Sequence, residues 1–233
     1  LKSKGLFDGK GLRNGDWTYY YESGILKEVT GYKLDKAEGK SESWHDNGLR
    51  YMLTNYKDNE TDGVEYIYFF NGNPRTTITY KNGKKDGPAK YYTVKGILNN
   101  TCTYVNDLKE GEELAYYENG KLYSKAVYNK DLVIGEYTEY HENGQILKTG
   151  NFEDGKATGL WKWFYDNGKP EYTGNYVKDE LEGEYLSYYE NGKLESRSFY
   201  KKKEIDGKKE DFDDDGVLYC ETIFERGRLR DIK

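Results

Sequence analysis

The sequence is poor in histidine, cysteine, methionine and proline, and it has no long apolar run. Of its 233 residues, two are His, two Cys, one Met and three Pro. No segment approaches the length of a membrane-spanning helix or of the apolar core of a signal peptide. Hydrophobic residues make up 35% and charged residues 33%, so the composition disfavours a compact globule with one large core.

An excess of one charge sign along the chain is also lacking. The formal net charge is −6, and basic and acidic residues are interleaved over the whole length. Because a polyanion is attracted by a basic field, we expect no binding to nucleic acid, and binding to anionic membranes is disfavoured.

Glycine and aromatic residues are abundant instead. The chain has 27 Gly and 26 Tyr, and 16% of its residues are aromatic. Tyr favours strands, whereas Gly marks turns. This composition indicates many short strands joined by turns, and the aromatic content argues against disorder.

Two sets of glycines recur every 24 residues, which is typical of a repeat protein. The first set runs from Gly15 to Gly207 and the second from Gly24 to Gly216, with nine members each. We call the first glycine of each repeat column 0 and number the following positions from it. Columns 5 and 17 are aromatic in all nine repeats. The stretch "YYENG" at 116–120 and 188–192 runs from column 5 to the second glycine at column 9.

Each repeat is predicted to be a β-hairpin. It has a strand of about six residues, a turn at Asn-Gly, a second strand ending at column 17, and a polar connection of six residues. A two-residue turn would separate the column 5 aromatic from the column 11 Leu. A three-residue loop with a left-handed Gly and a bulge places columns 5, 11, 15 and 17 on one face, so we expect this loop. Columns 2, 4 and 6 then lie on the opposite face.

The predicted fold class is all-β, an elongated single-layer antiparallel β-meander of about nine 24-residue β-hairpin repeats. Residues 1–14 break the spacing and are expected to form an N-terminal half repeat or cap. Residues 15–233 form one continuous array, and its highly charged last repeat acts as a C-terminal cap. We expect a monomer or a weak edge-to-edge dimer. Cys102 and Cys220 are predicted to be unpaired thiols, roughly 45 Å apart.

Residues for catalysis are sparse. His45 and His141 are four repeats apart, on the order of 40 Å, so no nucleophile with a base is readily assembled. Both occupy column 6, where several other repeats have Tyr. We interpret them as surface side chains that replace Tyr, and we predict that the protein is not an enzyme.

Two motifs resemble ligand loops without completing them. Asp211, Asp213, Asp215 and Gly216 resemble the start of a calcium loop, but Thr222 stands where the bidentate Glu is required. A charged strand with an ordinary turn explains the same residues. The segment 150–158 approaches a phosphate loop, but it lacks the Ser or Thr that holds magnesium and no helix pattern follows. We expect no cofactor and no metal.

Aromatic residues of columns 2, 4 and 6 form the candidate partner-binding surface. Tyr and Trp bury a large area at low entropic cost and keep a polar group. The candidates are Trp17, Tyr21, Tyr137, His141, Trp161, Trp163, Tyr165, Tyr185 and Tyr189. Alternatively, these side chains only cover their neighbours and stiffen the sheet. We expect the main site between 137 and 189, because four aromatic residues crowd positions 161–165.

The pattern G-x4-aromatic-x2-[ND]-G-x-L, followed by an aromatic residue at column 17, resembles the MORN repeat in its bacterial 24-residue variant. The stretch "YYENGKL" at 116–122 and 188–194 carries the resemblance, which covers residues 15–233. It implies a non-catalytic scaffold for protein–protein interaction. YwqK-type proteins of this architecture are grouped as antitoxin or immunity proteins, which implies a toxin as partner.

The resemblance leaves one other function and the location open. A membrane-associated scaffold that binds phospholipid head groups is the alternative function. The protein is expected in the bacterial cytoplasm or, if a leader was removed before Leu1, in the cell envelope or outside the cell.

Overall fold

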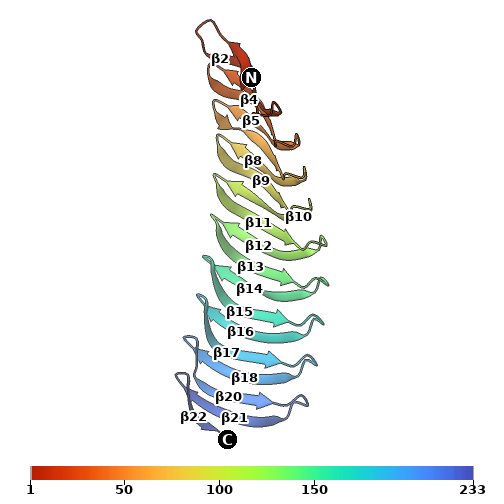
Figure 1. The fold of residues 1–233 in the computed structure, drawn as a ribbon. Coiled ribbons are helices and arrows are strands. Elements are labelled where there is room, and N and C mark those ends of the chain that lie inside the picture. Colours follow the sequence, from red (N-terminus) through yellow and green to blue (C-terminus); the bar gives the residue numbers. More distant parts are fainter. Residues whose placement is uncertain (1, 233) are drawn as a thin grey trace. The chain divides into compact units, whose positions relative to one another are not determined.

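The computed structural model describes residues 2–232, and all regular secondary structure in this range is β-strand. The chain forms two compact units, Leu1–Gly111 and Glu112–Lys233. Their boundary falls within strand β11 (Leu108–Tyr116). In each unit the strands follow one another in chain order (Figure 1).

In the first unit the strands from β1 to β10 form antiparallel pairs in chain order, with β6 and β7 acting as one interrupted strand. The two-residue strand β6 continues as β7 after Asp62, and both pair with β5. The strands are β1 (Ser3–Phe7), β2 (Arg13–Tyr20), β3 (Leu26–Lys33), β4 (Lys36–Trp44), β5 (Arg50–Lys57), β6 (Glu60–Thr61), β7 (Gly63–Tyr68), β8 (Pro74–Lys81), β9 (Lys84–Tyr92) and β10 (Leu98–Val105).

The second unit repeats this arrangement from β12 to β22. Here β19 and β20, separated by Asp206, both pair with β18. The strands are β12 (Leu122–Asn129), β13 (Leu132–Tyr140), β14 (Ile146–Glu153), β15 (Lys156–Phe164), β16 (Pro170–Val177), β17 (Glu180–Tyr188), β18 (Leu194–Lys201), β19 (Glu204–Ile205), β20 (Gly207–Phe212), β21 (Leu218–Glu225) and β22 (Arg228–Ile232). Both units are open antiparallel meanders of hairpins, which confirms the predicted all-β fold class.

The Asn-Gly segments form the predicted three-residue loops. Between β13 and β14 the His141 N–H donates to the Gln145 carbonyl and the Gly144 N–H to the His141 carbonyl, both at 2.8 Å. Gly144 has a φ of 93°, in the left-handed region that favours glycine. The Asn143 Oδ1 atom accepts from the Gln145 N–H at 2.9 Å, and its Nδ2 donates to the Asp166 carbonyl at 2.6 Å. Asn at column 8 thus shapes its own loop and binds the next one.

The other connection is shorter than predicted. Only two residues join the strands, and both have positive φ, for example Lys178 (52°) and Asp179 (70°) between β16 and β17. This is the geometry of a type I′ turn, whose twist matches that of the strands. The expected six-residue connection is wrong, because its polar residues continue the strands on both sides of the turn.

A one-residue bulge at column 12 determines which side chains share a face. In the β15–β16 pair, Trp163 lies opposite Tyr172. Next along the strand Phe164 lies opposite Pro170, so Glu171 is an extra residue. The same shift recurs in hairpins of both units. Because a shift by one residue exchanges the faces of a strand, columns 13, 15 and 17 lie with columns 2 and 4.

The predicted faces are therefore right for columns 5 and 11 and wrong for columns 15 and 17. Tyr188 lies opposite Leu194, as expected, but Tyr185 of column 2 lies opposite Ser198 of column 15. The predicted loop bulge is present. The additional bulge at column 12 exchanges the faces of the columns that follow it in the same strand, including columns 15 and 17.

The column 0 glycine belongs to a larger bulge that leaves the faces unchanged. In the β14–β15 pair Phe152 lies opposite Ala157 and Thr149 opposite Lys162, so β15 holds two extra residues. Gly159 lies in this bulge with a φ of 68°. Adding two residues to a strand preserves its alternation.

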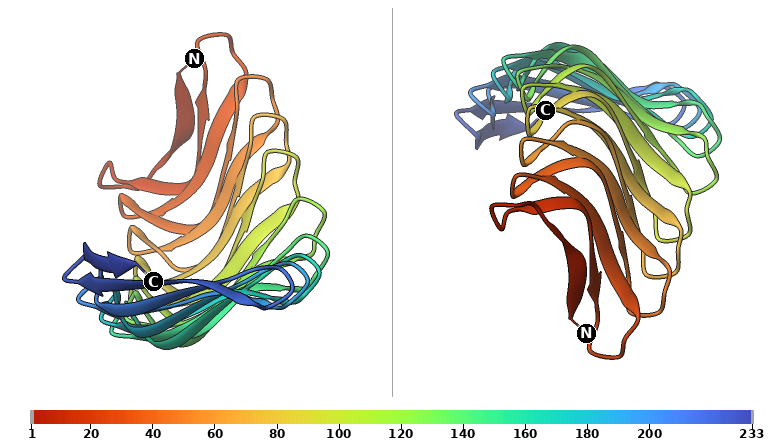
Figure 2. Two further views of the ribbon diagram at one scale, coloured as in Figure 1. Left: turned by 90° about the horizontal axis from the view of Figure 1, so that it is seen from below. Right: turned by 90° about the horizontal axis from the view of Figure 1, so that it is seen from above.

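Most buried side chains lie on the face of columns 2, 4, 13, 15 and 17, which we call the packed face. In the first unit Ile78, Ala89, Cys102 and Tyr104 form a small core there. The strands of both units are bowed (Figure 2). Most of the large rings on the packed face are only partly buried, whereas Trp17, Tyr104 and Trp161 are buried.

Candidate functional site

Eight aromatic side chains gather on the packed face of the second unit. They lie on six consecutive strands, from β13 to β18, and are called the aromatic face. Its members are Tyr137, Phe152, Trp161, Trp163, Tyr172, Tyr176, Tyr185 and Tyr200.

Trp161 is the centre of one half of the aromatic face. Its ring centroid lies 5.1 Å from that of Phe152 and 6.4 Å from that of Tyr176, both in edge contacts. Tyr137 lies 6.1 Å away. Trp161 is only 4% exposed, and its Nε1 atom is buried without a hydrogen-bond partner among the described residues. Trp161 therefore acts as the support on which the other rings pack.

The other half of the aromatic face is a row of stacked rings. The Trp163 and Tyr172 centroids are 4.4 Å apart, and Tyr185 stacks on Tyr172 at 5.8 Å. Tyr200 contacts Tyr185 edge-on at 5.8 Å. Because stacked rings cover one another's faces, their edges and polar atoms are what they present to a ligand. These four residues are half-buried, so the row is a surface.

A polar group borders the aromatic face at β13. Glu139 is 6% exposed and accepts hydrogen bonds from the Tyr137 and Tyr123 hydroxyls at 2.9 and 3.0 Å. Lys148 pairs with it at 2.8 Å. Burial alone would raise the pKa of Glu139, but the donors Lys148, Tyr137 and Tyr123 outweigh this and lower the pKa. Burial, followed by the bond to Glu139, raises the pKa of Tyr137, so its hydroxyl stays a donor.

Between Lys148 and Lys209 the packed face carries no charged side chain among the described residues. The residues that face the rings there are small, aliphatic or hydroxyl-bearing, namely Gly150, Ala157, Gly174, Leu181, Ser187, Ser196, Ser198 and Ile205. The flanking lysines are neutralised, Lys148 by Glu139 and Lys209 by Asp211 at 2.7 Å. In a chain that is 33% charged, this region stands out as neutral.

Column 6 has a different role from that predicted. The Tyr165 hydroxyl donates to the Tyr188 carbonyl at 2.6 Å, and the Tyr189 hydroxyl to the Phe212 carbonyl at 2.8 Å. The His141 Nε2 atom lies 2.8 Å from the Phe164 carbonyl. A carbonyl only accepts, so Nε2 carries the proton and His141 takes the place of Tyr. These side chains bind each hairpin to the next, outside the aromatic face.

His45 and Tyr21 of the first unit make the same contact. The Tyr21 hydroxyl donates to the Trp44 carbonyl at 2.7 Å, and the His45 Nε2 atom lies 3.4 Å from the Tyr68 carbonyl. The interpretation of both histidines as substitutes for Tyr is confirmed.

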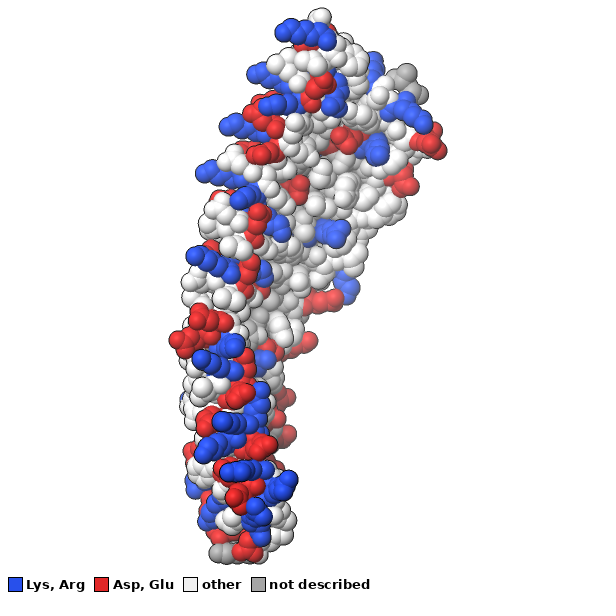
Figure 3. Space-filling model, turned by 90° about the vertical axis from the view of Figure 1, so that its left-hand side faces the viewer, with Lys and Arg blue, Asp and Glu red and all other residues white. Residues whose placement is uncertain are grey.

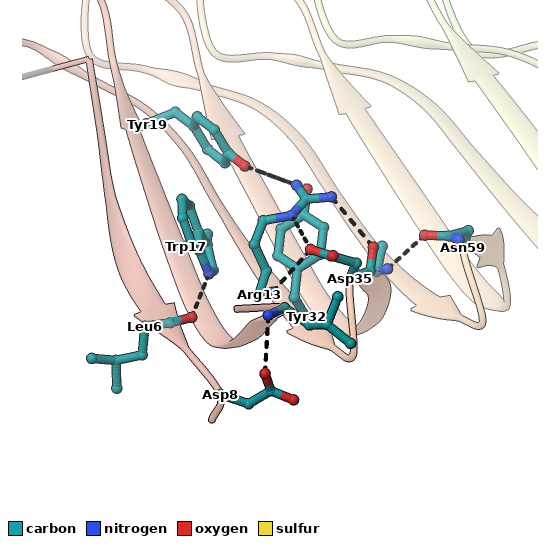
Figure 4. Close-up of polar contacts among 10 residues, drawn as sticks. Leu6, Asp8, Arg13, Trp17, Tyr19, Tyr32, Asp35 and Asn59 are labelled. Atoms are coloured by element: carbon teal, nitrogen blue, oxygen red, sulfur yellow. Dashed lines mark hydrogen bonds and ion pairs between the residues drawn. The ribbon is translucent and has the colours of Figure 1, made fainter. Parts of the chain in front are cut away.

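Trp17, the remaining candidate, lies in a separate cluster of the first unit (Figure 4). Its Nε1 donates to the Leu6 carbonyl at 3.1 Å, and it is 8% exposed. Arg13 lies over the Tyr32 ring at 3.8 Å and its Nε binds the Asp35 carboxylate at 3.0 Å. The bond to Asp35 raises the pKa of Arg13. This cluster is closed by an ion pair and offers less ring surface than the aromatic face.

The sequence prediction thus found four members of the aromatic face, Tyr137, Trp161, Trp163 and Tyr185, and missed four. Phe152, Tyr176 and Tyr200 belong to column 17 and Tyr172 to column 13, which were placed on the wrong face. The sequence did contain a signal that columns 15 and 2 share a face. Column 15 is glycine in two repeats, at Gly150 and Gly174, and in both cases the next repeat has a large ring at column 2.

The charged turns carry no cluster of metal ligands. Asp213 Oδ1 accepts from the Asp215 and Val217 N–H groups, and Asp215 pairs with Lys193 at 3.1 Å, as in a charged turn. No three His, Cys, Asp or Glu side chains lie together as metal ligands in residues 2–232. Within the same range no helix could cross a membrane. Figure 3 shows basic and acidic side chains interleaved on the side that it presents.

A protein-family model described as "MORN repeat variant" matches the chain six times, at residues 13–34, 61–82, 109–130, 134–154, 157–178 and 181–202. These matches cover more than half of the sequence, and the chain belongs to the MORN repeat variant family. It is a β-sheet scaffold of MORN repeats. The predicted repeats that begin at Gly39, Gly87 and Gly207 lie outside the matches but form the same hairpins, β4–β5, β9–β10 and β20–β21.

Among solved structures the likeness is weak. "Crystal Structure of TcdB2-TccC3-TEV" matches with 10% identity over 95% of this chain and 15% of that chain, at a TM-score of 0.19. "Crystal Structure of TcdB2-TccC3-Cdc42" matches with 14% identity over 93% of this chain and 16% of that chain, at a TM-score of 0.17. The chain spans less than a fifth of their length. No curated protein matches the chain.

Proposed function

We propose that this protein is a non-catalytic scaffold that binds another protein through the aromatic face of its second unit. The observation that carries the proposal is the neutral, half-exposed row of Trp163, Tyr172 and Tyr185 on a chain rich in charge. Tyr and Trp dominate the binding energy of protein interfaces, because they bury much area and lose few rotamers.

Three observations favour binding over catalysis. His45 and His141 both bind backbone carbonyls, so neither is poised as a base for a substrate. The buried carboxylate Glu139 is fully engaged by two hydroxyls and a lysine. A hollow at the turns, between Glu153 and Lys178, is open and lined by charged side chains, unlike the concave apolar sites that enzymes use.

The partner is proposed to be a toxin that the protein neutralises. This part rests on the resemblance of the repeats to those of YwqK-type antitoxins. A preformed, rigid surface suits tight neutralisation, because little conformational entropy is lost on binding. Binding to phospholipid head groups is the competing function, and the interleaved charges of Figure 3 speak against it.

Site-specific photo-crosslinking in the native cell tests the proposal. Benzoylphenylalanine replaces Tyr185 on the aromatic face or Leu186, its neighbour on the opposite face of β17. We expect one defined protein adduct from position 185 and none from position 186. Equal adducts at both positions, or none at either, would contradict binding through this face, and transfer to lipid would favour the membrane function. Toxicity of the captured protein when it is produced without this chain then tests the antitoxin proposal.

A further inference from the structure

We propose that the aromatic face binds a proline-rich segment in the polyproline II conformation, lying across the strands. The inference rests on the proposed function and names the class of partner. It follows from the period of the rings, the neutrality of the face and the hydroxyl groups that the sheet leaves without partners.

The first argument is geometric. Phe152, Tyr176 and Tyr200 occupy the same column in three successive repeats, on β14, β16 and β18. Each repeat adds two strands, so equivalent rings recur about every 9.6 Å across the sheet. A polyproline II helix has three residues per turn and advances about 9.3 Å per turn. A segment laid across the strands therefore presents the same side to each of the three rings.

The second argument is electrostatic. From Gly150 to Ile205 the described residues of the packed face carry no charge, and the lysines at its borders are already paired. A charged ligand would lose its hydration there without gaining a counter-charge. Complementarity therefore favours an uncharged segment, and proline supplies an apolar ring with no charge and no N–H donor.

The third argument concerns hydrogen-bond donors. The hydroxyls of Tyr172, Tyr176, Tyr185 and Tyr200 bind no other group in residues 2–232. The backbone of polyproline II forms no internal hydrogen bonds, so its carbonyls are free to accept. Proline-rich segments in the polyproline II conformation are commonly recognised by aromatic side chains that line the binding site.

The first unit lacks this combination. Three of its four column 17 tyrosines are engaged by other side chains. Arg13 covers Tyr32, and the Tyr104 hydroxyl bonds that of Tyr91 at 3.0 Å. Tyr80 is hydrogen-bonded to Glu65, a carboxylate at column 2, where the second unit has Trp161. The first unit therefore provides a matched control within the same chain.

The test is a titration of the full chain with a ten-residue proline peptide, in which Trp fluorescence and calorimetry measure binding. We expect saturable binding that Tyr176→Ala weakens at least about tenfold, the effect of losing an interface anchor. Tyr80→Ala, the same column in the first unit, should leave the affinity unchanged, and a Gly-Ser peptide of equal length should not bind. Circular dichroism verifies that each variant is folded.

Should Tyr176→Ala not fold, Tyr176→Phe keeps the ring and removes only the donor, and a several-fold loss is expected. Absence of saturable binding by the wild-type chain, or an equal loss with Tyr80→Ala, would overturn the inference. A protein adduct at position 185 together with no binding of the proline peptide would overturn this inference alone and leave the proposed function standing.

Discussion

The ring of Trp161 lies directly against the backbone of Gly150 on the neighbouring strand. A Cβ atom at Gly150 would lie 2.1 Å from the Trp161 Cδ2 atom. Gly5 and Trp17 have the same relationship in the first unit, at 2.3 Å. Where column 2 is small, as at Ser41, the facing residue is Thr30, and their hydroxyls bond at 2.7 Å. In these pairs the residues that face each other across the boundary between hairpins are therefore complementary in size.

Gly150→Ala should destabilise the second unit by about 1–3 kcal/mol, because the added methyl forces the indole out of its place. The backbone at Gly150 does not require glycine, since its φ lies outside the left-handed region. Chemical denaturation followed by far-UV circular dichroism measures the loss.

The double variant Gly150→Ala with Trp161→Ser recreates a small pair like that of Thr30 and Ser41. We expect it to be more stable than the sum of the two single effects by at least about 1 kcal/mol. Strict additivity in the double-mutant cycle would mean that Gly150 and Trp161 do not constrain each other.

His141 should be replaceable by Tyr but not by Phe. Tyr165 and Tyr189 make the same bond to the next hairpin that His141 makes to the Phe164 carbonyl. His141→Tyr is expected to change the free energy of unfolding little, whereas His141→Phe should cost about 1 kcal/mol through the lost hydrogen bond. Thermal unfolding compares the three chains, and equal melting temperatures for Tyr and Phe at this position would refute the assigned role.

Much of the fold could be predicted because the turn glycines and the aromatic positions recur at the same places in every repeat. Glycines that require positive φ recur without exception, and the paired positions of Tyr188 and Leu194 fixed the loop type. The bulge at column 12 could not be predicted, since its residues, such as Lys27, Glu171 and Tyr219, share no chemistry.

This one bulge accounts for the errors at the candidate site. If this bulge is omitted, Tyr176 and Tyr200 are placed on the face away from Trp163. Only four of the eight members of the aromatic face are then identified. Column 6 was misassigned for another reason. The partner of Tyr165 is a backbone carbonyl of the next repeat. Every residue has a backbone carbonyl, so the sequence pattern does not reveal which one accepts a hydrogen bond.

Alkaline pH should weaken the second unit. Burial raises the pKa of Tyr185 to about 12 from 10.0. Between these values the unfolded chain releases the proton and the folded chain retains it, so the stability present below pH 10 is lost as the pH rises to 12. The expected contribution is about 1 kcal/mol, reduced from the full linkage value because the ring is half exposed.

Urea denaturation at pH 9 and pH 11.5 measures this loss. Tyr185→Phe has no ionisable hydroxyl and should show a smaller decrease between the two pH values than the wild-type chain. An identical decrease in both would show that Tyr185 does not contribute to the pH dependence.

The central claim is that the column 12 bulge brings the rings of columns 2 and 17 onto one face, and ring-to-ring nuclear Overhauser effects test it most directly. The account predicts contacts from Trp161 to Phe152 and Tyr176, whose ring centroids lie 5.1 and 6.4 Å from it. Absence of both contacts in the folded chain would contradict it, because without the bulge Tyr176 would lie on the face away from Trp161.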